Sequence, residues 1–124
     1  MKNHILSTLL LCTSSFCFAS CKAPESLFES KDCIRLELQK VDRKVHATYV
    51  AARKSVSQDA DEEHIKASLA ALAEAQKAWA IYRDKECNFE FVMNGGYGNA
   101  SQNEIACKIE LGQKRIARLA EIGR

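Results

Sequence analysis

The sequence lacks several features that would indicate a common class of protein. Charge of one sign is not in excess, because 18 basic and 16 acidic residues give a formal net charge of +2 over 124 residues. A balanced charge provides no electrostatic footprint for nucleic acid or an anionic membrane. No segment alternates apolar and polar residues for long enough to indicate a β-strand. There is also no CxxC pair, and the histidines lie far from the cysteines along the chain, so we expect no metal site.

Long apolar runs are missing except at the N-terminus. Residues 1–19 combine Lys2 with an apolar stretch and then small residues, which is the pattern of a secretory signal. Serine and threonine interrupt the stretch before it reaches the roughly 20 apolar residues of a membrane span. We expect cleavage after Ala19, which leaves residues 20–124 as one periplasmic or secreted domain with a formal charge of about +1. Lipoprotein processing at Cys21 is a second interpretation.

The cysteines indicate disulfide bonds. Two of the six leave with the signal, and the mature chain keeps Cys21, Cys33, Cys87 and Cys107. An even number in a small exported domain is typical of a disulfide framework, and it favours a soluble product over one acylated at Cys21. We favour the pairs Cys21–Cys33 and Cys87–Cys107, each closing a loop worth about 3 kcal/mol in the chain-entropy model. Other connectivities, such as Cys21 with Cys107, stay open.

Apolar residues recur at steps of three and four, which predicts three amphipathic helices. The first covers Asp32–Val56 and the second Glu62–Met93, with Asp59 as its N-terminal cap in a capping box with Glu62. The third begins at a capping box of Ser101 and Glu104. The second helix would be about 48 Å long, so we expect one end to project or bend. The fold class is therefore all-α, a small antiparallel three-helix hairpin or bundle stapled by two disulfides.

The sequence contains few residues that could form a catalytic site. Residues 94–99 form the only glycine cluster and predict a loop, but no Lys-Ser/Thr follows it as in a phosphate-binding loop. His46 and His64 fit exposed helix positions, and Glu86 with Glu90 fits a solvated acidic patch. With the cysteines in disulfides, no nucleophile has a base and an orienting group within reach. We therefore expect no enzyme activity and no cofactor.

Polar and aromatic side chains that could form specific contacts are concentrated in the second predicted helix, before Cys87. Gln76, Trp79 and Arg83 share one helical face, where an apolar stripe becomes polar. We predict that Trp79 packs in the core and that Arg83 pairs with Asp42 on the first helix. Direct contact of this face with a ligand is the alternative.

These residues resemble a known family. The run Leu72–Cys87, LAEAQKAWAIYRDKEC, is followed by Phe89-Glu90, by the double glycine Gly95-Gly96, and by Cys107 with Arg115 and Leu119 downstream. The front half adds Cys21, Glu29, Cys33, the run Leu38–Asp42 and Tyr49. Together they resemble the LprI-type lysozyme-inhibitor family of small exported bacterial proteins, over nearly the whole mature chain. Tyr97 stands where the family usually has serine, and Gly112 where it usually has threonine.

The resemblance implies an envelope location and a protein partner, possibly lysozyme. The candidate binding residues are Asn94, Gly95, Gly96 and Tyr97, with Glu90 beside them, and an acidic patch of Glu86, Glu90 and Glu104 would face a cationic lysozyme. The candidate structural motif comprises Asp42, Gln76, Trp79, Arg83, Asp84 and Arg115.

A different class of function remains open. The chain would then be an envelope interaction module, or an immunity-like partner of a secreted toxin, that binds through a helix face. Its signature would be an exposed apolar patch along the first or second helix. The sequence leaves the oligomeric state undetermined.

Overall fold

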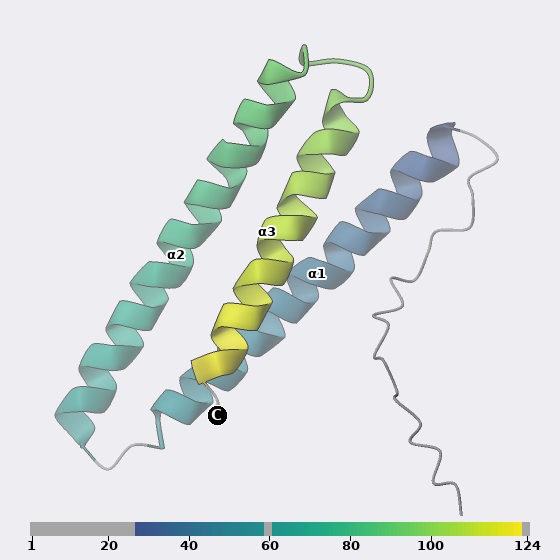
Figure 1. Cartoon of the computed structure of the whole chain (residues 1–124). Helices are drawn as coiled ribbons and strands as arrows, with labels where there is room; N and C mark the ends of the chain where they lie inside the picture. The colour runs from purple at the N-terminus through teal and green to yellow at the C-terminus, as the bar shows by residue number, and fades with distance from the viewer. Residues whose placement is uncertain (1–26, 59–60, 123–124) are drawn as a thin grey trace, which may run out of the picture.

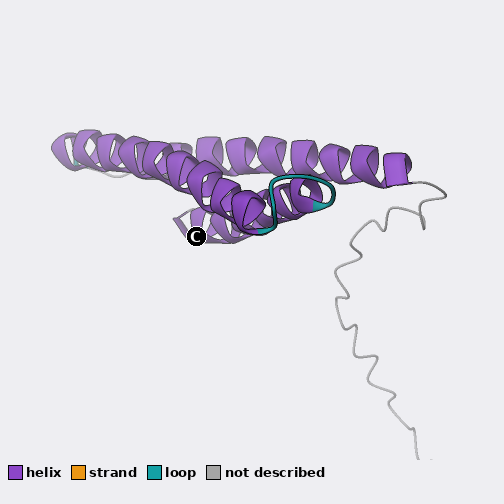
Figure 2. Ribbon diagram, turned by 90° about the horizontal axis from the view of Figure 1, so that it is seen from above, coloured by secondary structure: helices purple, strands orange, loops and turns teal. Residues whose placement is uncertain are grey.

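The computed structural model describes residues 27–58 and 61–122, and these ranges hold only helices and turns (Figures 1 and 2). Helix α1 spans Leu27–Val56, α2 spans Glu62–Met93 and α3 spans Ala100–Ile122. Consecutive helices run in opposite directions, so α1 and α3 descend in Figure 1 while α2 ascends. The predicted all-helical, antiparallel three-helix architecture is confirmed for the described ranges. The predicted signal segment, its predicted cleavage point and Cys21 lie outside them.

The bounds of α2 agree with the prediction, but its cap does not. The N-cap is Asp61, whose Oδ1 accepts the backbone N–H of Glu63 at 3.0 Å and of His64 at 3.3 Å. Asp61 directly precedes the first helical residue, so its short side chain reaches the unpaired amides of the first turn. The predicted cap, Asp59, lies outside the described residues.

The other two helices begin earlier than predicted. Helix α3 starts at Ala100, so Ser101 lies inside the first turn, and Glu104 binds Lys108 at 2.7 Å instead of completing a capping box. The carbonyl of Asn99 accepts the N–H groups of Gln102 and Asn103, which lets the loop lead directly into the helix. Helix α1 already includes Leu27–Lys31 ahead of the predicted start at Asp32, and this segment holds no proline or glycine that would interrupt a helix.

Helix α3 is the central element, because it packs along both α1 and α2 whereas those two helices touch each other little. Val41, Val45 and Ala52 of α1 are buried against α3, where Leu119 is 1% exposed. Gly112 permits the close approach of α1 and α3, since a Cβ atom there would lie 2.4 Å from Cγ1 of Val41.

We predict that Gly112→Ala lowers the free energy of unfolding by about 1–3 kcal/mol, because the added methyl overlaps a stiff β-branched side chain. Chemical denaturation measures the change. Val41→Ala should recover part of the loss in the double variant, because it removes the atom that the new Cβ meets. If Gly112→Ala lowers the free energy of unfolding equally in the wild type and in the Val41→Ala variant, the contact between the two positions is contradicted.

Candidate functional site

The α2–α3 loop, residues 94–99, is a tightly hydrogen-bonded turn at one end of the molecule (Figure 1). The N–H of Gly95 donates to the carbonyl of Val92 and that of Gly96 to the carbonyl of Phe91, each at 3.0 Å. This is the Schellman pattern, which satisfies the last carbonyls of a helix and needs a left-handed residue after the cap. Gly95 supplies it with φ of +88°. The prediction of a glycine loop with positive φ is confirmed.

Tyr97 lies at the exposed tip of this loop. Its ring is 82% exposed, yet it lies over the backbone of Gly95, where an added Cβ would be 3.5 Å from Cε1 of the ring. Three apolar side chains at the end of α2, Phe89, Val92 and Met93, are between 58% and 69% exposed. The loop therefore presents an aromatic group on a rigid backbone next to further apolar surface.

The Cys87–Cys107 disulfide joins α2 to α3 below the loop. Its Cα atoms are 5.5 Å apart, and the two cysteines are 0% and 8% exposed. The predicted pairing is confirmed. Cys33 is also disulfide-bonded, but its predicted partner Cys21 lies outside the described residues, so that pairing stays a prediction.

The acidic groups beside the loop form a smaller patch than predicted. Glu86 and Glu90 are exposed on α2, one helical turn apart. Glu104 does not join them as a free charge, since it binds Lys108 at 2.7 Å. Asp84 lies 4.0 Å from the same Lys108 Nζ and 3.8 Å from Arg83 Nε. The available negative charge near the loop therefore comes from Glu86 and Glu90.

The predicted structural motif assembles into one junction of the three helices. The Arg83 Nη1 on α2 donates to the Oδ1 of Asp42 on α1 at 2.6 Å, so the predicted ion pair is confirmed. The side chain of Arg83 is 16% exposed and that of Asp42 46%. This pair joins α1 to α2, which otherwise make few contacts.

Trp79 lies at the centre of this junction, which we call the Trp79 junction. The guanidinium of Arg83 lies 4.9 Å from the ring centroid, and that of Arg115 on α3 lies 5.8 Å from it. Arg115 Nε also donates to Oε1 of Gln76 at 2.9 Å. One cation–π contact and an amide oxygen thus take the place of a carboxylate partner for Arg115.

The environment of Arg115 is unfavourable to its charge. Burial, with a smaller contribution from the neighbouring positive charge of Arg118, lowers the pKa of Arg115. One nitrogen of each of Arg83 and Arg115 is buried without a hydrogen-bond partner among the described residues. Sequence reasoning placed Trp79 and Arg83 on one face but missed the contact of Arg115 with both Trp79 and Gln76, because it joins separate helices.

The Trp79 junction is separate from the loop. Arg83 precedes Asn94 by about 16 Å along the axis of α2, at 1.5 Å per residue. Its residues contact one another across three helices, which positions α2 relative to α1 and α3. The motif with the strongest family resemblance is therefore part of the scaffold, whereas the most exposed candidate residues lie in the loop.

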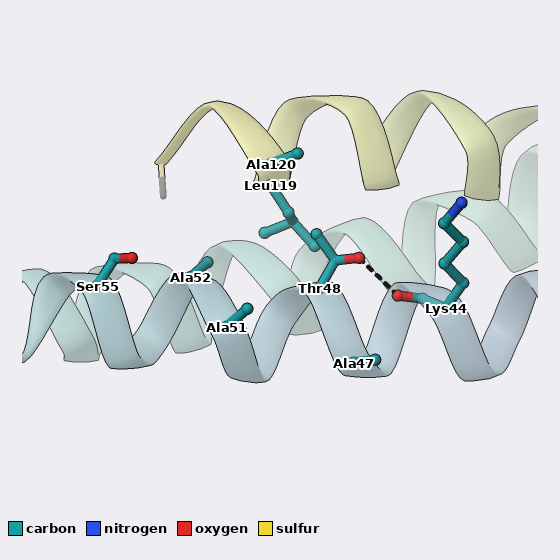
Figure 3. Close-up of a pocket in the computed structure, with 8 residues that line it drawn as sticks. All are labelled: Lys44, Ala47, Thr48, Ala51, Ala52, Ser55, Leu119 and Ala120. Carbon is teal, nitrogen blue, oxygen red and sulfur yellow. Dashed lines mark hydrogen bonds between the residues drawn. The ribbon is translucent and has the colours of Figure 1, made fainter. Parts of the chain in front are cut away.

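A shallow groove lies between α1 and α3 (Figure 3). It has a volume of about 460 Å³ and is lined mainly by small side chains: Lys44, Ala47, Thr48, Ala51, Ala52, Ser55, Leu119 and Ala120. The Thr48 hydroxyl donates to the carbonyl of Lys44 at 2.7 Å. The groove contains no carboxylate or imidazole, so it offers no acid–base pair for catalysis.

The remaining candidates from the sequence are isolated from one another. His46 and His64 occupy exposed positions on different helices, as predicted. Within residues 27–58 and 61–122, no three His, Cys, Asp or Glu side chains come close enough to hold a metal ion. No described helix has a stretch both long and apolar enough to cross a bilayer.

We predict that the Asp42–Arg83 pair contributes a coupling free energy of about 1–2 kcal/mol, because Arg83 is largely shielded from water. A double-mutant cycle with Asp42→Ala and Arg83→Ala measures it by chemical denaturation. The pair Glu110–Lys114, in which both side chains are about two-thirds exposed, is the matched control and should show no resolvable coupling. Equal couplings for the two pairs would contradict a stabilising role for the junction.

We also predict that Cys87→Ala with Cys107→Ala lowers the free energy of unfolding by about 3 kcal/mol, since the bond closes a loop with a sequence separation of 20. Thermal unfolding of the oxidised protein and the double variant provides the comparison. An unchanged melting temperature would show that helix packing alone fixes α3 against α2.

Comparison with known proteins gives one result that identifies the family. No curated protein and no solved structure matches the chain at a significant level. The family model described as lysozyme inhibitor LprI matches residues 17–119, a range that includes the loop, the disulfide and every residue of the Trp79 junction. The chain therefore belongs to the LprI lysozyme-inhibitor family.

Proposed function

We propose that the protein inhibits a muramidase such as lysozyme by inserting the 94–99 loop into the enzyme's substrate cleft. Family membership supports a protein partner of this class. We choose this surface because Tyr97, an aromatic residue at the tip of the loop, is 82% exposed. Exposed tyrosines are enriched among the residues that dominate binding energy in protein interfaces.

The rigidity of the loop favours this role. Its first residues are hydrogen-bonded to the last turn of α2, and the Cys87–Cys107 disulfide holds both flanking helices. A loop that is already ordered loses little conformational entropy when it binds, so more of the contact energy appears as affinity. Tyr97 is itself restrained by its contact with the backbone of Gly95.

Charged side chains favour binding to lysozyme through local contacts rather than through long-range attraction. The formal net charge of +2 gives no steering toward a cationic lysozyme. Glu86 and Glu90 lie exposed on the last turns of α2 beside the loop, where they can pair with basic groups at the rim of the cleft. The proposed interface therefore combines an apolar tip with an acidic flank.

The proposed compartment matches the covalent chemistry. We propose that residues 1–19 are removed on export and that Cys21 pairs with Cys33, which is disulfide-bonded. Disulfides persist in oxidising compartments such as the periplasm or the exterior of the cell. The same compartment is where a bacterial protein meets lysozyme.

One observation favours the second candidate, an envelope interaction module or an immunity-like partner of a secreted toxin. Helix α2 carries exposed apolar side chains along the side facing away from α3, including Ile81, Tyr82 and Phe89. An extended apolar face is typical of a surface that binds another protein. Ile81 and Tyr82 lie more than two helical turns before the loop, so variants of this face and of the loop can be tested separately.

We predict that the oxidised protein inhibits cell-wall lysis by a c-type lysozyme at micromolar concentration and that Tyr97→Ala weakens inhibition at least about tenfold, as expected for a central aromatic contact. Gly95→Ala should weaken it as well, because alanine is strained at φ of +88° and shifts the backbone under Tyr97. A turbidity assay with whole cell walls gives the inhibition constants.

Leu36→Ala is the matched control, since Leu36 is 57% exposed but lies on α1, outside both the loop and α2. It should leave inhibition unchanged. Equal inhibition by the wild type and Tyr97→Ala would show that the contact surface lies outside the loop. No inhibition of any muramidase tested at micromolar excess would reject the inhibitor function and favour the interaction module.

A further inference from the structure

The side of α2 that faces away from α3 carries a regular series of exposed residues. Six of them follow strict three-four spacing along the helix: Ala71, Glu74, Ala78, Ile81, Lys85 and Asn88. The same spacing continues to Ala67 before them and to Val92 after them, and all these residues are exposed. We call this series the outer seam. Figure 1 shows no other described helix on this side of α2.

The spacing of the outer seam is that of a coiled-coil contact, in which a residue faces the partner helix every 3.5 positions on average. A second, inner face of the same helix already contacts α3 through Trp79 and the buried Cys87, and contacts α1 through Arg83. An ordinary surface helix has one apolar face and one charged face. The outer face of α2 instead combines alanines, Ile81 and Val92 with only two charged residues, and no described helix covers it.

The size of the apolar surface suits a small protein interface. Five large side chains on or beside the outer seam are 49–69% exposed: Ile81, Tyr82, Phe89, Val92 and Met93. Each exposes on the order of 100 Å², so one chain presents about 500 Å² of apolar surface from these groups alone. Two such faces would bury about 1,000 Å², near the lower limit for a specific protein interface.

The distribution of side-chain size along the outer seam is self-complementary. Small residues occupy its first half, including Ala67, Ala71 and Ala78, and large ones its second half, including Ile81 and Val92. If a second α2 lies antiparallel with the two-fold axis between Ala78 and Ile81, Ala67 faces Val92 and Ala78 faces Ile81 of the other copy. The small Ala67 and Ala78 then face the larger Val92 and Ile81, as a closely packed interface requires.

The charges of the outer seam specify the same arrangement. Its two charged residues, Glu74 and Lys85, are equally distant from that two-fold axis, and neither forms an ion pair with another described residue. In the antiparallel pair, Glu74 of each copy faces Lys85 of the other, which gives two attractive contacts. A parallel pair would place Glu74 against Glu74 and Lys85 against Lys85. Like charges in register disfavour that alternative.

From size, spacing and charge together we propose that the outer seam binds a second copy of this chain, forming an antiparallel two-fold dimer through α2. The proposal is independent of lysozyme inhibition. It places one 94–99 loop at each end of the dimer, because the loop follows the last residue of α2. The small area predicts a dimer that forms at micromolar concentration and dissociates on dilution.

Charge reversal tests the arrangement. In sedimentation equilibrium with the oxidised full domain, Glu74→Lys and Lys85→Glu should each weaken the dimer about tenfold or more, because each variant places two like-charge pairs at the contact. An equimolar mixture of the two single variants should dimerise again, since every contact is then between opposite charges. The double variant should also dimerise alone.

Controls separate this result from misfolding and from the loop. Glu110→Lys, on an exposed position of α3, should leave the dimer unchanged, and circular dichroism checks that every variant keeps its helix content. Tyr97→Ala should keep the dimer while inhibition falls, and Glu74→Lys should keep inhibition. A wild type that stays monomeric at several hundred micromolar would overturn the proposal. So would single variants that dimerise normally, or a mixture that fails to recover the dimer.

Discussion

The Cys87–Cys107 disulfide is the constraint on which the rest of the structure depends. The apolar core is thin, and the largest fully buried side chains in the described chain are Leu119 and Cys87 itself. A domain of this size buries a limited share of its surface, so a covalent link contributes a large part of its stability. The bond fixes α2 against α3, and the ends of these two helices determine the shape of the 94–99 loop.

The two faces of α2 differ in what they contact. A covalent bond and the polar Trp79 junction hold its inner face, and the apolar residues Leu69, Leu72 and Trp79 are partly buried. Five further large apolar residues of α2 are exposed on or beside the outer seam. The family motif centred on Trp79 orients the helix, and the exposed surfaces that it orients are the ones proposed to bind a partner and a second copy.

The sequence predicted the features that depend on local or strongly paired chemistry. The glycine cluster ended α2 at Met93, and the charge on Arg83 required an opposite partner, which Asp42 provides on α1. The caps were predicted poorly, because several neighbouring Asp and Ser residues satisfy the same pattern and only Asp61 directly precedes the helix. The Glu104–Lys108 pair is an i, i+4 contact within α3, which helical spacing permits. The contact of Arg115 with Trp79 instead depends on how α2 and α3 are placed in three dimensions, and helical periodicity carries no information about it.

Hydrogen–deuterium exchange of the protein in complex with a c-type lysozyme tests most directly whether the stapled loop is the inhibitory surface. We expect saturating lysozyme to slow exchange at the amides of residues 97–99, while the amides that line the α1–α3 groove exchange as they do in the free protein. Slower exchange confined to the groove, with the loop unaffected by a bound lysozyme, would contradict it.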